Sequence, residues 1–563
     1  MRSGAGRQAG ARHREVEIAN LTRGTLLGAH IQVAENARAR AIGLLGQRRL
    51  DPGGGLLIDP SSGIHTFGMR FSIDVVAVDR HLCVRGVREA LGAFRIAGLS
   101  WKTSCVVELP VGAIRESATQ PGDQLELRTA GVSVPLTTEG STRIRRRAGK
   151  RYTTVALSVV LALACYVLNY RVLRPVVLRA NPTIDFACYY RSAAMVMAGD
   201  GVSLYDVKAQ HGYDIQLRRA MGAARFDSRR FLAPPFVLLY YLPFAWLAFA
   251  RAQVAWYVFN GGLLLGLPFV LRPVLGRGKL QAAAVLAPAL FLPVLFTLIE
   301  GQNTALLVFL LAMSFIAFAR NAPVYCGCLL ALAGFKPHLV LPLLLGFLLS
   351  REWEVIAGFG SAAVALLGAS AALAGWQATL SFGSTVVDFT RLPAEFGGDS
   401  PWAMPNLRGA LYILLHDRVS AHALAMATLI ASALLMIAAA ICFARCRKRA
   451  PELGFALALV IAVLTSYHGY FHEAALLLPA FLLTAASVMR GGSARLRWVY
   501  LAAISILYVA PAAASSFQQA VLMMVAAMFA FVAGLSIDAL RTLQHRHEEA
   551  ALALPVFNPP AYG

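Results

Sequence analysis

Long uncharged, apolar segments recur along the chain from about residue 150 onward. A helix that crosses a bilayer needs roughly 20 consecutive apolar residues. Runs on this scale occupy 153–170, 231–250, 252–271, 280–299, 355–387, 419–444 and 498–537, and the last is long enough for two spans. Since no such run precedes residue 150, the pattern predicts a polytopic α-helical membrane protein whose N-terminal part is a separate, water-soluble unit.

The residues before the first apolar run show a shorter pattern that is typical of β-strands. Strand-like segments are Val16–Ala19, Ile31–Ala34, Leu56–Ile58, Ile73–Val78, Cys105–Leu109 and Leu125–Leu127. A helical period between Glu35 and Gln47 indicates one helix, and the Pro-Gly pairs at 52–53 and 121–122 mark turns. We expect a strand-rich α+β domain over residues 15–138, preceded by a disordered basic N-terminus over residues 1–14.

The positive charge of the chain fits a membrane topology better than a nucleic-acid partner. The net charge is +22, with 52 Lys and Arg against 30 Asp and Glu. These cations gather in short loops between apolar runs, as the positive-inside rule requires of cytoplasmic loops. A basic juxtamembrane linker over 139–152 favours the same, anionic leaflet. We expect roughly twelve crossings of a bacterial inner membrane, in a membrane domain over 153–540, with the N-terminal domain and the 541–563 tail in the cytoplasm.

No segment has the residue spacing of a metal or cofactor site. The eight cysteines are scattered, and the closest pairs (Cys326 with Cys328, Cys442 with Cys446) lack a second pair of ligands at zinc spacing. In the N-terminal domain, His65 and Asp79 flank Asp74, which the alternation places on a strand where backbone amides can satisfy its carboxylate. We therefore expect neither a metal nor a cofactor.

Polar residues that are costly in apolar surroundings fall on one side of the expected topology. A charge at the centre of a bilayer costs about 2.5–3.5 kcal/mol, so such residues are functional candidates by default. They are Asp185, Glu300, Gln302, Asn303, Lys336, Asn406, Arg408, His468, His472 and Glu473. A channel would spread such groups through the depth of the membrane. Their concentration at the external face instead indicates a site there.

The N-terminal domain resembles the domain of unknown function 192 family. The resemblance rests on GLLGQRRLDPGGGLLI, HTFGMRFSIDVVAVD and VVELPVGAIRESATQPGDQLEL, which together cover nearly the whole domain. The family usually has a Trp-Met pair where this chain has Phe67-Gly68-Met69. Because the family has no agreed activity, the resemblance implies a fold and no reaction.

Residues 150–540 carry an ordered series of short motifs. The series is Asp185-Phe-x-x-Tyr-Tyr, Gly201-x-x-Leu-Tyr-Asp, Ala233-Pro-Pro, Leu242-Pro, Trp256 with Asn260, Gly301-Gln-Asn, Phe335-Lys-Pro, Asn406-Leu-Arg-Gly and a late His-bearing segment. This order resembles glycosyltransferase family 87. The family's common Tyr-Pro-Pro is Ala233-Pro234-Pro235 here, and its late Trp-Asp-His or Tyr-Asp is SYHGYFHE.

The resemblance implies a type-C glycosyltransferase fold, to which the charge pattern adds about 12 transmembrane helices. It also implies a polyprenyl-phosphate sugar as donor, with mannose as one candidate sugar. The partners are then that donor, a lipid or glycan acceptor and membrane lipids, and the reaction takes place on the external face without a required metal. The family's catalytic aspartate corresponds to Asp185.

Residue chemistry fits these roles. A carboxylate such as Asp185 can take the proton of the acceptor hydroxyl, and a cation can stabilise the departing phosphate. The candidate cations, in order of preference, are Arg408, Lys336, His472 and Arg191. The residues expected to bind substrate are Tyr189, Tyr190, Gln302, Asn303, Asn406 and Glu473.

Structural explanations stand beside several of these roles. Asp185 can cap a helix that starts at Phe186, and Gln302 and Asn303 can cap the next helix. Lys336-Pro337 can be a helix break whose lysine snorkels outward. For the whole chain, a secondary transporter or lipid flippase also suits many crossings and broken helices. A third interpretation is a non-catalytic membrane scaffold in which the N-terminal domain is the working part.

Overall fold

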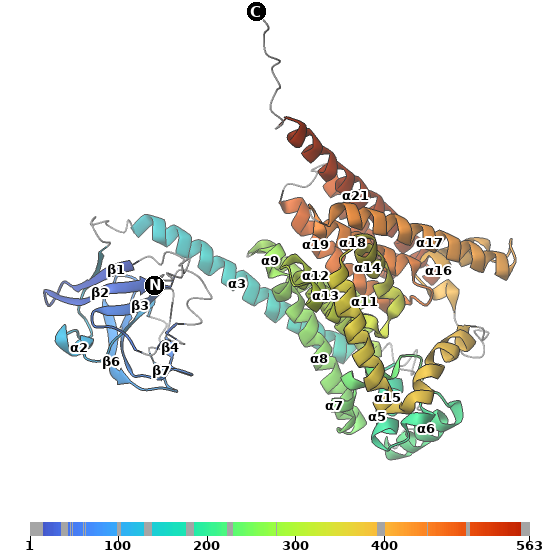
Figure 1. Ribbon diagram of the computed structural model, residues 1–563, viewed down its shortest axis with the longest axis horizontal. Coiled ribbons are helices and arrows are strands. Elements are labelled where there is room, and N and C mark those ends of the chain that lie inside the picture. Colours follow the sequence, from blue (N-terminus) through green and yellow to red (C-terminus); the bar gives the residue numbers. More distant parts are fainter. Residues whose placement is uncertain are drawn as a thin grey trace, which may run out of the picture. The chain divides into compact units, whose positions relative to one another are not determined.

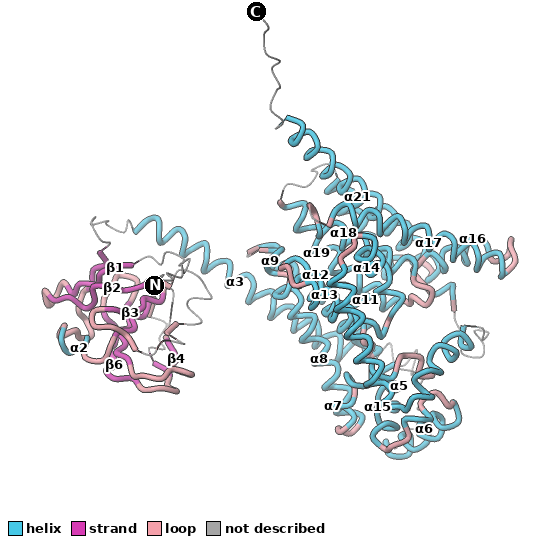
Figure 2. Tube along the Cα trace, in the orientation of Figure 1, coloured by secondary structure: helices cyan, strands magenta, loops and turns pink. Residues whose placement is uncertain are grey.

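The computed structural model divides into two compact units, Met1–Arg145 and Arg146–Gly563 (Figure 1). It describes residues 15–34, 43–44, 47, 49–59, 61, 63–97, 103–128, 138–175, 185–221, 229–276, 278–390, 400–447, 449–490 and 496–552. The N-terminus over 1–14, the end of the tail over 553–563 and most of the helix predicted for Glu35–Gln47 lie outside the described residues. The first unit is rich in strands and the second is mostly helical, as the sequence predicts (Figure 2).

A mixed seven-stranded sheet forms the N-terminal domain, in the order β6-β5-β8-β3-β2-β1-β9. Its strands are β1 (Glu15–Asn20), β2 (Thr25–Val33), β3 (Gly54–Ile58), β5 (Ile73–Val78), β6 (Val84–Leu91), β8 (Cys105–Leu109) and β9 (Leu125–Arg128). The β2 and β3 strands pair in parallel, and the other neighbours pair antiparallel. The short strands β4 (Ile64–His65) and β7 (Ile96–Ala97) form a second sheet, and α2 (Ala113–Glu116) is a single turn.

Burial explains which strands the sequence reveals. Every residue of β5 and of β8 is buried, because these central strands are covered on both faces. Such strands are nearly continuous apolar runs, interrupted here by Asp74 and Glu108. Two separate apolar clusters, one containing Val76 and Val107 and the other Val75 and Val106, cover the two faces. The β6 strand was not predicted, because it lies at the edge of the sheet and mixes Arg and Glu with its apolar residues.

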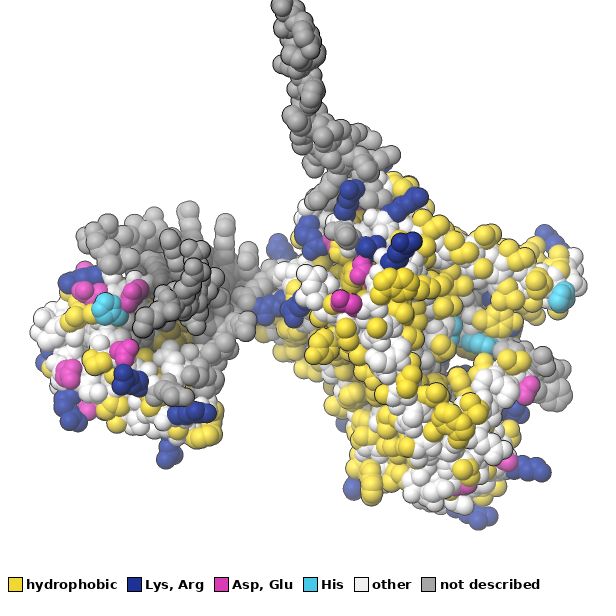
Figure 3. Space-filling model, in the orientation of Figure 1, with side chains coloured by type: hydrophobic (Ala, Val, Ile, Leu, Met, Phe, Trp, Pro, Cys, Tyr) yellow, Lys and Arg dark blue, Asp and Glu magenta, His cyan; other side chains and the backbone are white. Residues whose placement is uncertain are grey.

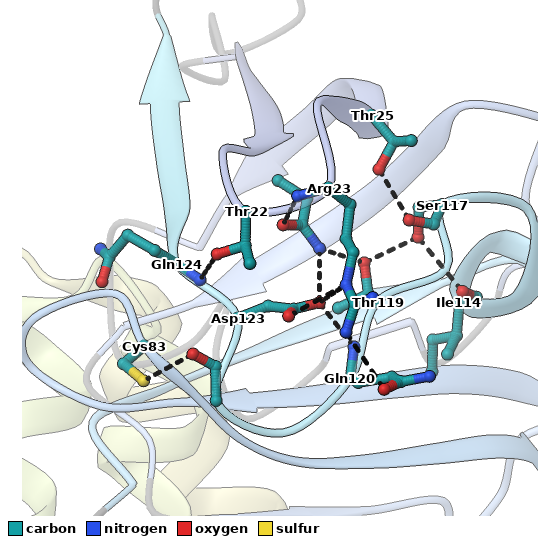
Figure 4. A network of polar contacts seen from close by, with 12 residues as sticks. Thr22, Arg23, Thr25, Cys83, Ile114, Ser117, Thr119, Gln120, Asp123 and Gln124 are labelled. Carbon is teal, nitrogen blue, oxygen red and sulfur yellow. Dashed lines mark hydrogen bonds and ion pairs between the residues drawn. The ribbon is translucent and has the colours of Figure 1, made fainter.

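Buried carboxylates of the N-terminal domain serve its loops. Asp74 accepts hydrogen bonds from the backbone amides of Ala90 (2.8 Å), Gly112 (3.0 Å) and Ile114 (3.1 Å), which confirms the strand role predicted for it. Figure 4 shows a second network, in which Asp123 pairs with Arg23 at 3.2 Å and accepts from the backbone amide of Gln120 at 2.8 Å. These contacts fix the turns that connect the strands.

A long helix, α3 (Thr138–Leu168), begins in the last residues of the first unit, runs into the second and continues into the π-helical turn η1 (Asn169–Leu173). The helices that follow are α5 (Asp185–Met197), η2 (Gly201–Ser203), α6 (Val207–Met221), η3 (Pro235–Tyr240), α7 (Leu242–Ala245), α8 (Phe249–Val270), α9 (Arg272–Leu275), α10 (Lys279–Leu290), α11 (Leu292–Glu300), α12 (Thr304–Ala319), α13 (Pro323–Leu332) and η4 (Ala333–Phe335). The last group is α14 (Pro337–Leu349), α15 (Trp353–Thr390), η6 (Pro401–Ala403), α16 (Leu407–Leu415), α17 (Ala421–Cys446), α18 (Pro451–Thr465), η7 (Phe471–Leu476), α19 (Leu477–Met489), α20 (Leu496–Ala513) and α21 (Phe517–Leu552).

Six helices among the described residues are long and apolar enough to cross a membrane, or seven if the pair α10–α11, bent by 53°, is one span. Shorter apolar helices of 10–17 residues, such as α12, α14 and α18, lie between them. Apolar side chains cover much of the drawn surface of this unit (Figure 3), as expected of a surface that faces lipid. The α18 helix is apolar all round and almost fully buried, which makes it the centre of the core.

Breaks between helices create the non-helical backbone from which the site is built. The α11 helix ends at Gly301, whose φ of 69° is left-handed. A Cβ at this position would lie 2.5 Å from the Cβ of Phe186, so only glycine fits. Lys336 separates η4 from α14, and α14 starts with a proline at its first position, as the sequence predicted for this break. A third interruption of the helices ends with the turn η7, which leads directly into α19.

Candidate functional site

Asp185 is the centre of a buried polar cluster. The residue opens α5 and is 7% exposed. Its Oδ2 accepts a short hydrogen bond from the side-chain amide of Gln302, and its Oδ1 lies 3.3 Å from Nε of Arg229. Burial raises the pKa of the Asp185 carboxyl above its ordinary value, and the Arg229 guanidinium opposes that rise. The result is a carboxylate that is held in place and is a stronger base than an exposed one.

A second acid and a histidine lie beside Asp185. Nδ1 of His472 is 2.8 Å from Oε2 of Glu300, and the two side chains are 7% and 22% exposed. The backbone carbonyl of His472 accepts from the hydroxyl of Thr297 at 3.0 Å, which ties η7 to α11. One carboxylate oxygen from each of Asp185 and Glu300 and one ring nitrogen of His472 all lie within 4.8 Å of one another. Three groups that can accept or donate protons therefore meet at one point.

These three side chains have the donor types of a divalent-cation site, namely two carboxylates and one imidazole. Each carboxylate already has a nitrogen partner, since Asp185 faces Arg229 and Glu300 faces His472. A bound ion would have to displace these contacts. The charge of the cluster is therefore compensated by protein side chains, and its fit to a metal is poor.

A buried ion pair forms the next part of the site. Nζ of Lys336 lies 3.0 Å from Oε1 of Glu473 and donates to the hydroxyl of Thr304 at 3.1 Å. The lysine and glutamate side chains are only 10% and 6% exposed. Nε2 of His338 is 3.7 Å from the other carboxylate oxygen of Glu473. Lys336 thus turns inward to a carboxylate, so the snorkelling interpretation does not describe it.

Aromatic rings line the cluster next to Asp185. Tyr189 stacks on Tyr241 with ring centres 4.4 Å apart, and Tyr241 stacks on Trp256 at 4.2 Å. The indole of Trp256 donates to the carbonyl of Gly301 at 2.8 Å, which fixes the turn that carries Gln302. Tyr190 is buried and donates to the carbonyl of Leu247 at 2.9 Å. Tyr189 is therefore placed at the site, while the hydroxyl of Tyr190 serves the packing of α5.

The side-chain contacts of Asp185, Gln302 and Asn303 differ from those of helix caps. Asp185 is the first residue of α5, and its carboxylate contacts Gln302 and Arg229. Asn303 is fully buried at the N-cap position of α12, but its side chain makes no cap hydrogen bond. Gln302 binds Asp185 with its amide nitrogen. The side chains of Asp185 and Gln302 thus contact each other, and the side chain of Asn303 does not cap α12.

Other residues expected at the site hold loops. Nη1 of Arg191 pairs with Asp214 at 3.0 Å, both almost fully buried, so it joins α5 to α6. Asn406 caps α16 by accepting from the amide of Gly409 at 2.9 Å and donates to the carbonyl of Ser466 at 2.8 Å. The guanidinium of Arg408 lies 3.9 Å over the ring of Tyr467 and donates to its carbonyl at 2.9 Å. The structure therefore connects Asn406 and Arg408 to the segment that precedes His472.

Sequence reasoning missed the partners that complete the cluster. Arg229, Thr304 and His338 were not selected, and Glu300 was noted only as a costly polar residue. A signal for Arg229 exists, because Arg229-Arg230 directly precedes the Phe-Leu-Ala-Pro-Pro motif.

A groove of about 620 Å³ between α14, α15 and α17 is lined by apolar residues such as Leu345, Leu348 and Ile437. It lies at the far end of α14 from Lys336 and contains no acid–base pair.

Comparisons with known proteins agree with the sequence motifs. Residues 231–467 match the model of glycosyltransferase family 87, and residues 19–127 match the family described as uncharacterized ACR, which is the domain of unknown function 192 family. No curated protein matches the chain.

Among solved structures, a candidate transcription regulator from Sinorhizobium meliloti 1021 is 21% identical, covering 21% of this chain and 97% of its own, with a TM-score of 0.19. A protein of unknown function from Novosphingobium aromaticivorans DSM 12444 is 16% identical, covering 20% of this chain and 83% of its own, also with a TM-score of 0.19. The family matches are therefore the informative ones. They show a region that matches glycosyltransferase family 87, within a helical unit that has several helices long and apolar enough to cross a membrane, preceded in the chain by a region that matches the domain of unknown function 192 family.

Proposed function

We propose that the protein transfers a sugar from a polyprenyl-phosphate donor to a hydroxyl group of a lipid or glycan acceptor. Asp185 is the general base of this reaction, and the site faces the outside of the bacterial inner membrane. The observation that carries the proposal is the Asp185 carboxylate itself, which is 7% exposed and held by Gln302 and Arg229 at a meeting point of broken helices. A lipid-linked donor suits a site that is surrounded by apolar helices.

The reaction balances with the groups present. The acceptor hydroxyl oxygen forms a bond to the anomeric carbon while the bond from that carbon to the donor phosphate oxygen breaks. The hydroxyl proton passes to Asp185, and the bonding electrons leave with the polyprenyl phosphate. Attack from the face opposite the phosphate inverts the anomeric centre. Burial raises the pKa of Asp185 and so strengthens it as a base for this step.

The surrounding residues have supporting roles in this proposal. His472, held by Glu300, lies close enough to Asp185 to carry the proton onward. Tyr189 offers an aromatic face of the kind that sugars stack on. Asn303 and Glu473 supply buried polar atoms for sugar hydroxyls. The basic loops of the sequence support an arrangement of roughly twelve spans with both ends in the cytoplasm.

A donor panel tests the proposal. Purified protein in detergent is incubated with radiolabelled polyprenyl-phosphate mannose, glucose or arabinose and a membrane lipid extract as acceptor. We expect label to move into a lipid or glycan product from one of these donors, with inversion at the anomeric carbon. Folded protein that transfers nothing from any of them, yet moves labelled polyprenyl phosphate across a vesicle membrane, would support the flippase alternative instead.

A further inference from the structure

The cations that the sequence offers for the donor phosphate are already engaged. Lys336 pairs with Glu473, Arg191 with Asp214, His472 with Glu300, and Arg408 lies on Tyr467. The first three are 10% exposed or less in their side chains. A phosphate that reached one of them would first have to break a buried ion pair, and the carboxylate left behind would be destabilising.

Arg229 is arranged differently. Its Nε lies 3.3 Å from Oδ1 of Asp185, yet 47% of its side chain is exposed. Within the described part of the chain, Asp185 is the only ion-pair partner of its side chain, and the charge of Glu300 also acts on it. A guanidinium has five N–H donors in a planar fork. The contact with Asp185 uses one edge of that fork, so the Nη donors remain for a second anion.

Buried contacts hold the backbone of this segment in place. The carbonyl of Arg229 accepts from Nη2 of Arg191 at 3.2 Å, and the amide of Phe231 donates to Gln210 at 3.3 Å. Gln210 also accepts from Arg191 at 2.8 Å. The Arg191–Asp214 pair therefore positions Arg229 from behind, which gives Arg191 an indirect role at the site.

We propose that Arg229 binds the phosphate of the polyprenyl-phosphate donor through its Nη groups while its Nε stays on Asp185. This inference rests on the proposed function and names the phosphate subsite of the same reaction. Arginine suits the task because its fork matches two phosphate oxygens at once. One side chain then connects the base to the leaving group.

Charge movement during transfer favours this bridge. As Asp185 takes the acceptor proton, it loses its negative charge, and the phosphate gains one when its bond to the sugar breaks. A cation fixed between them has a counter-charge before and after the step. Little reorganisation is then needed at the moment of reaction, which is the condition for effective electrostatic stabilisation.

The test is binding of radiolabelled polyprenyl phosphate to the full chain in detergent, with uncharged polyprenol as the comparison ligand. We expect Arg229→Gln to weaken binding of polyprenyl phosphate 10- to 100-fold, as loss of a charge-assisted fork worth about 1.5–3 kcal/mol requires, and to leave polyprenol binding unchanged. Arg229→Lys keeps the charge without the fork and should bind polyprenyl phosphate with an affinity between those of the wild type and Arg229→Gln. Arg230→Gln removes the adjacent, exposed arginine and should bind like the wild type.

The outcomes separate the two proposals. If wild-type protein prefers polyprenyl phosphate but Arg229→Gln and Arg229→Lys bind it equally well, the Arg229 subsite is wrong while the donor class stands. If wild-type protein does not distinguish polyprenyl phosphate from polyprenol, the donor class itself is wrong. Retention of a single thermal unfolding transition confirms that each variant is folded, and Arg229→Lys decides the matter if Arg229→Gln does not fold.

Discussion

The buried pair of Lys336 and Glu473 allows a quantitative test of what Lys336 does. Nζ and Oε1 are 3.0 Å apart, so the attraction at an effective dielectric of about 20 is roughly 5 kcal/mol. Desolvation of both groups offsets much of this. Replacing Lys336 by Met leaves a buried carboxylate without its cation, a change that typically costs about 3–5 kcal/mol. The double variant Lys336→Met with Glu473→Gln removes both charges and should recover most of the lost free energy of unfolding.

Thermal unfolding in detergent measures this cycle. At about 2 °C per kcal/mol, the lower end for large domains, Lys336→Met should lower Tm by roughly 6–10 °C. The double variant should lie within a few degrees of the wild type and should still bind polyprenyl phosphate. A double variant that is stable but no longer binds polyprenyl phosphate would show that Lys336 contacts the donor. A single variant as stable as the wild type would refute the ion-pair reasoning altogether.

Two further predictions concern other parts of the chain. Gly301→Ala places a Cβ 2.5 Å from that of Phe186 at a φ of +69°, whereas a Cβ at Gly262 meets nothing within 4 Å. The backbone strain alone should lower the free energy of unfolding of Gly301→Ala by about 1–3 kcal/mol. Gly301→Ala should therefore lower Tm and reduce sugar transfer, and Gly262→Ala should do neither. In the N-terminal domain, burial raises the pKa of Glu108 from 4.5 to about 7. The folded domain then binds the proton more tightly, so its stability falls as pH rises from about 4.5 through 7, by about 3 kcal/mol in all. Urea unfolding at pH 5 and pH 8 should show most of this loss for the wild type and for the control Glu126→Gln, which changes a half-exposed glutamate paired with Arg128. Glu108→Gln should not show it, and equal pH dependence of all three proteins would contradict the prediction.

The sequence predicted the elements whose apolar residues all face the core. The β5 and β8 strands are buried along their whole length and α18 from Leu453 to Leu464, so all three are mainly apolar, with Asp74 and Glu108 as the exceptions in the strands. The β6 strand was missed because an edge strand has less apolar surface to bury and so tolerates Arg and Glu. Breaks at Gly301 and Lys336 were also predictable, since glycine and the residue before proline carry local conformational preferences.

The composition of the site was predictable, and its pairings were not. Asp185, Gln302, His472 and Glu473 were selected one by one, because a polar residue in an apolar stretch is conspicuous. Whether Lys336 faces a phosphate or Glu473 depends on packing between segments 137 residues apart in the sequence. The same holds for Arg229: its place before the Phe-Leu-Ala-Pro-Pro motif is a weak local signal, and its importance comes from its distance to Asp185.

The catalytic role of Asp185 is tested most directly by single-turnover transfer from the donor that the panel identifies. Wild-type protein is compared with Asp185→Asn and with Asp417→Asn, which changes an aspartate that is 85% exposed. Loss of a positioned general base should lower the transfer rate about 10²- to 10⁴-fold for Asp185→Asn, with donor binding retained and with Asp417→Asn like the wild type. An Asp185→Asn variant that transfers sugar at the wild-type rate would contradict the assignment of Asp185 as the base.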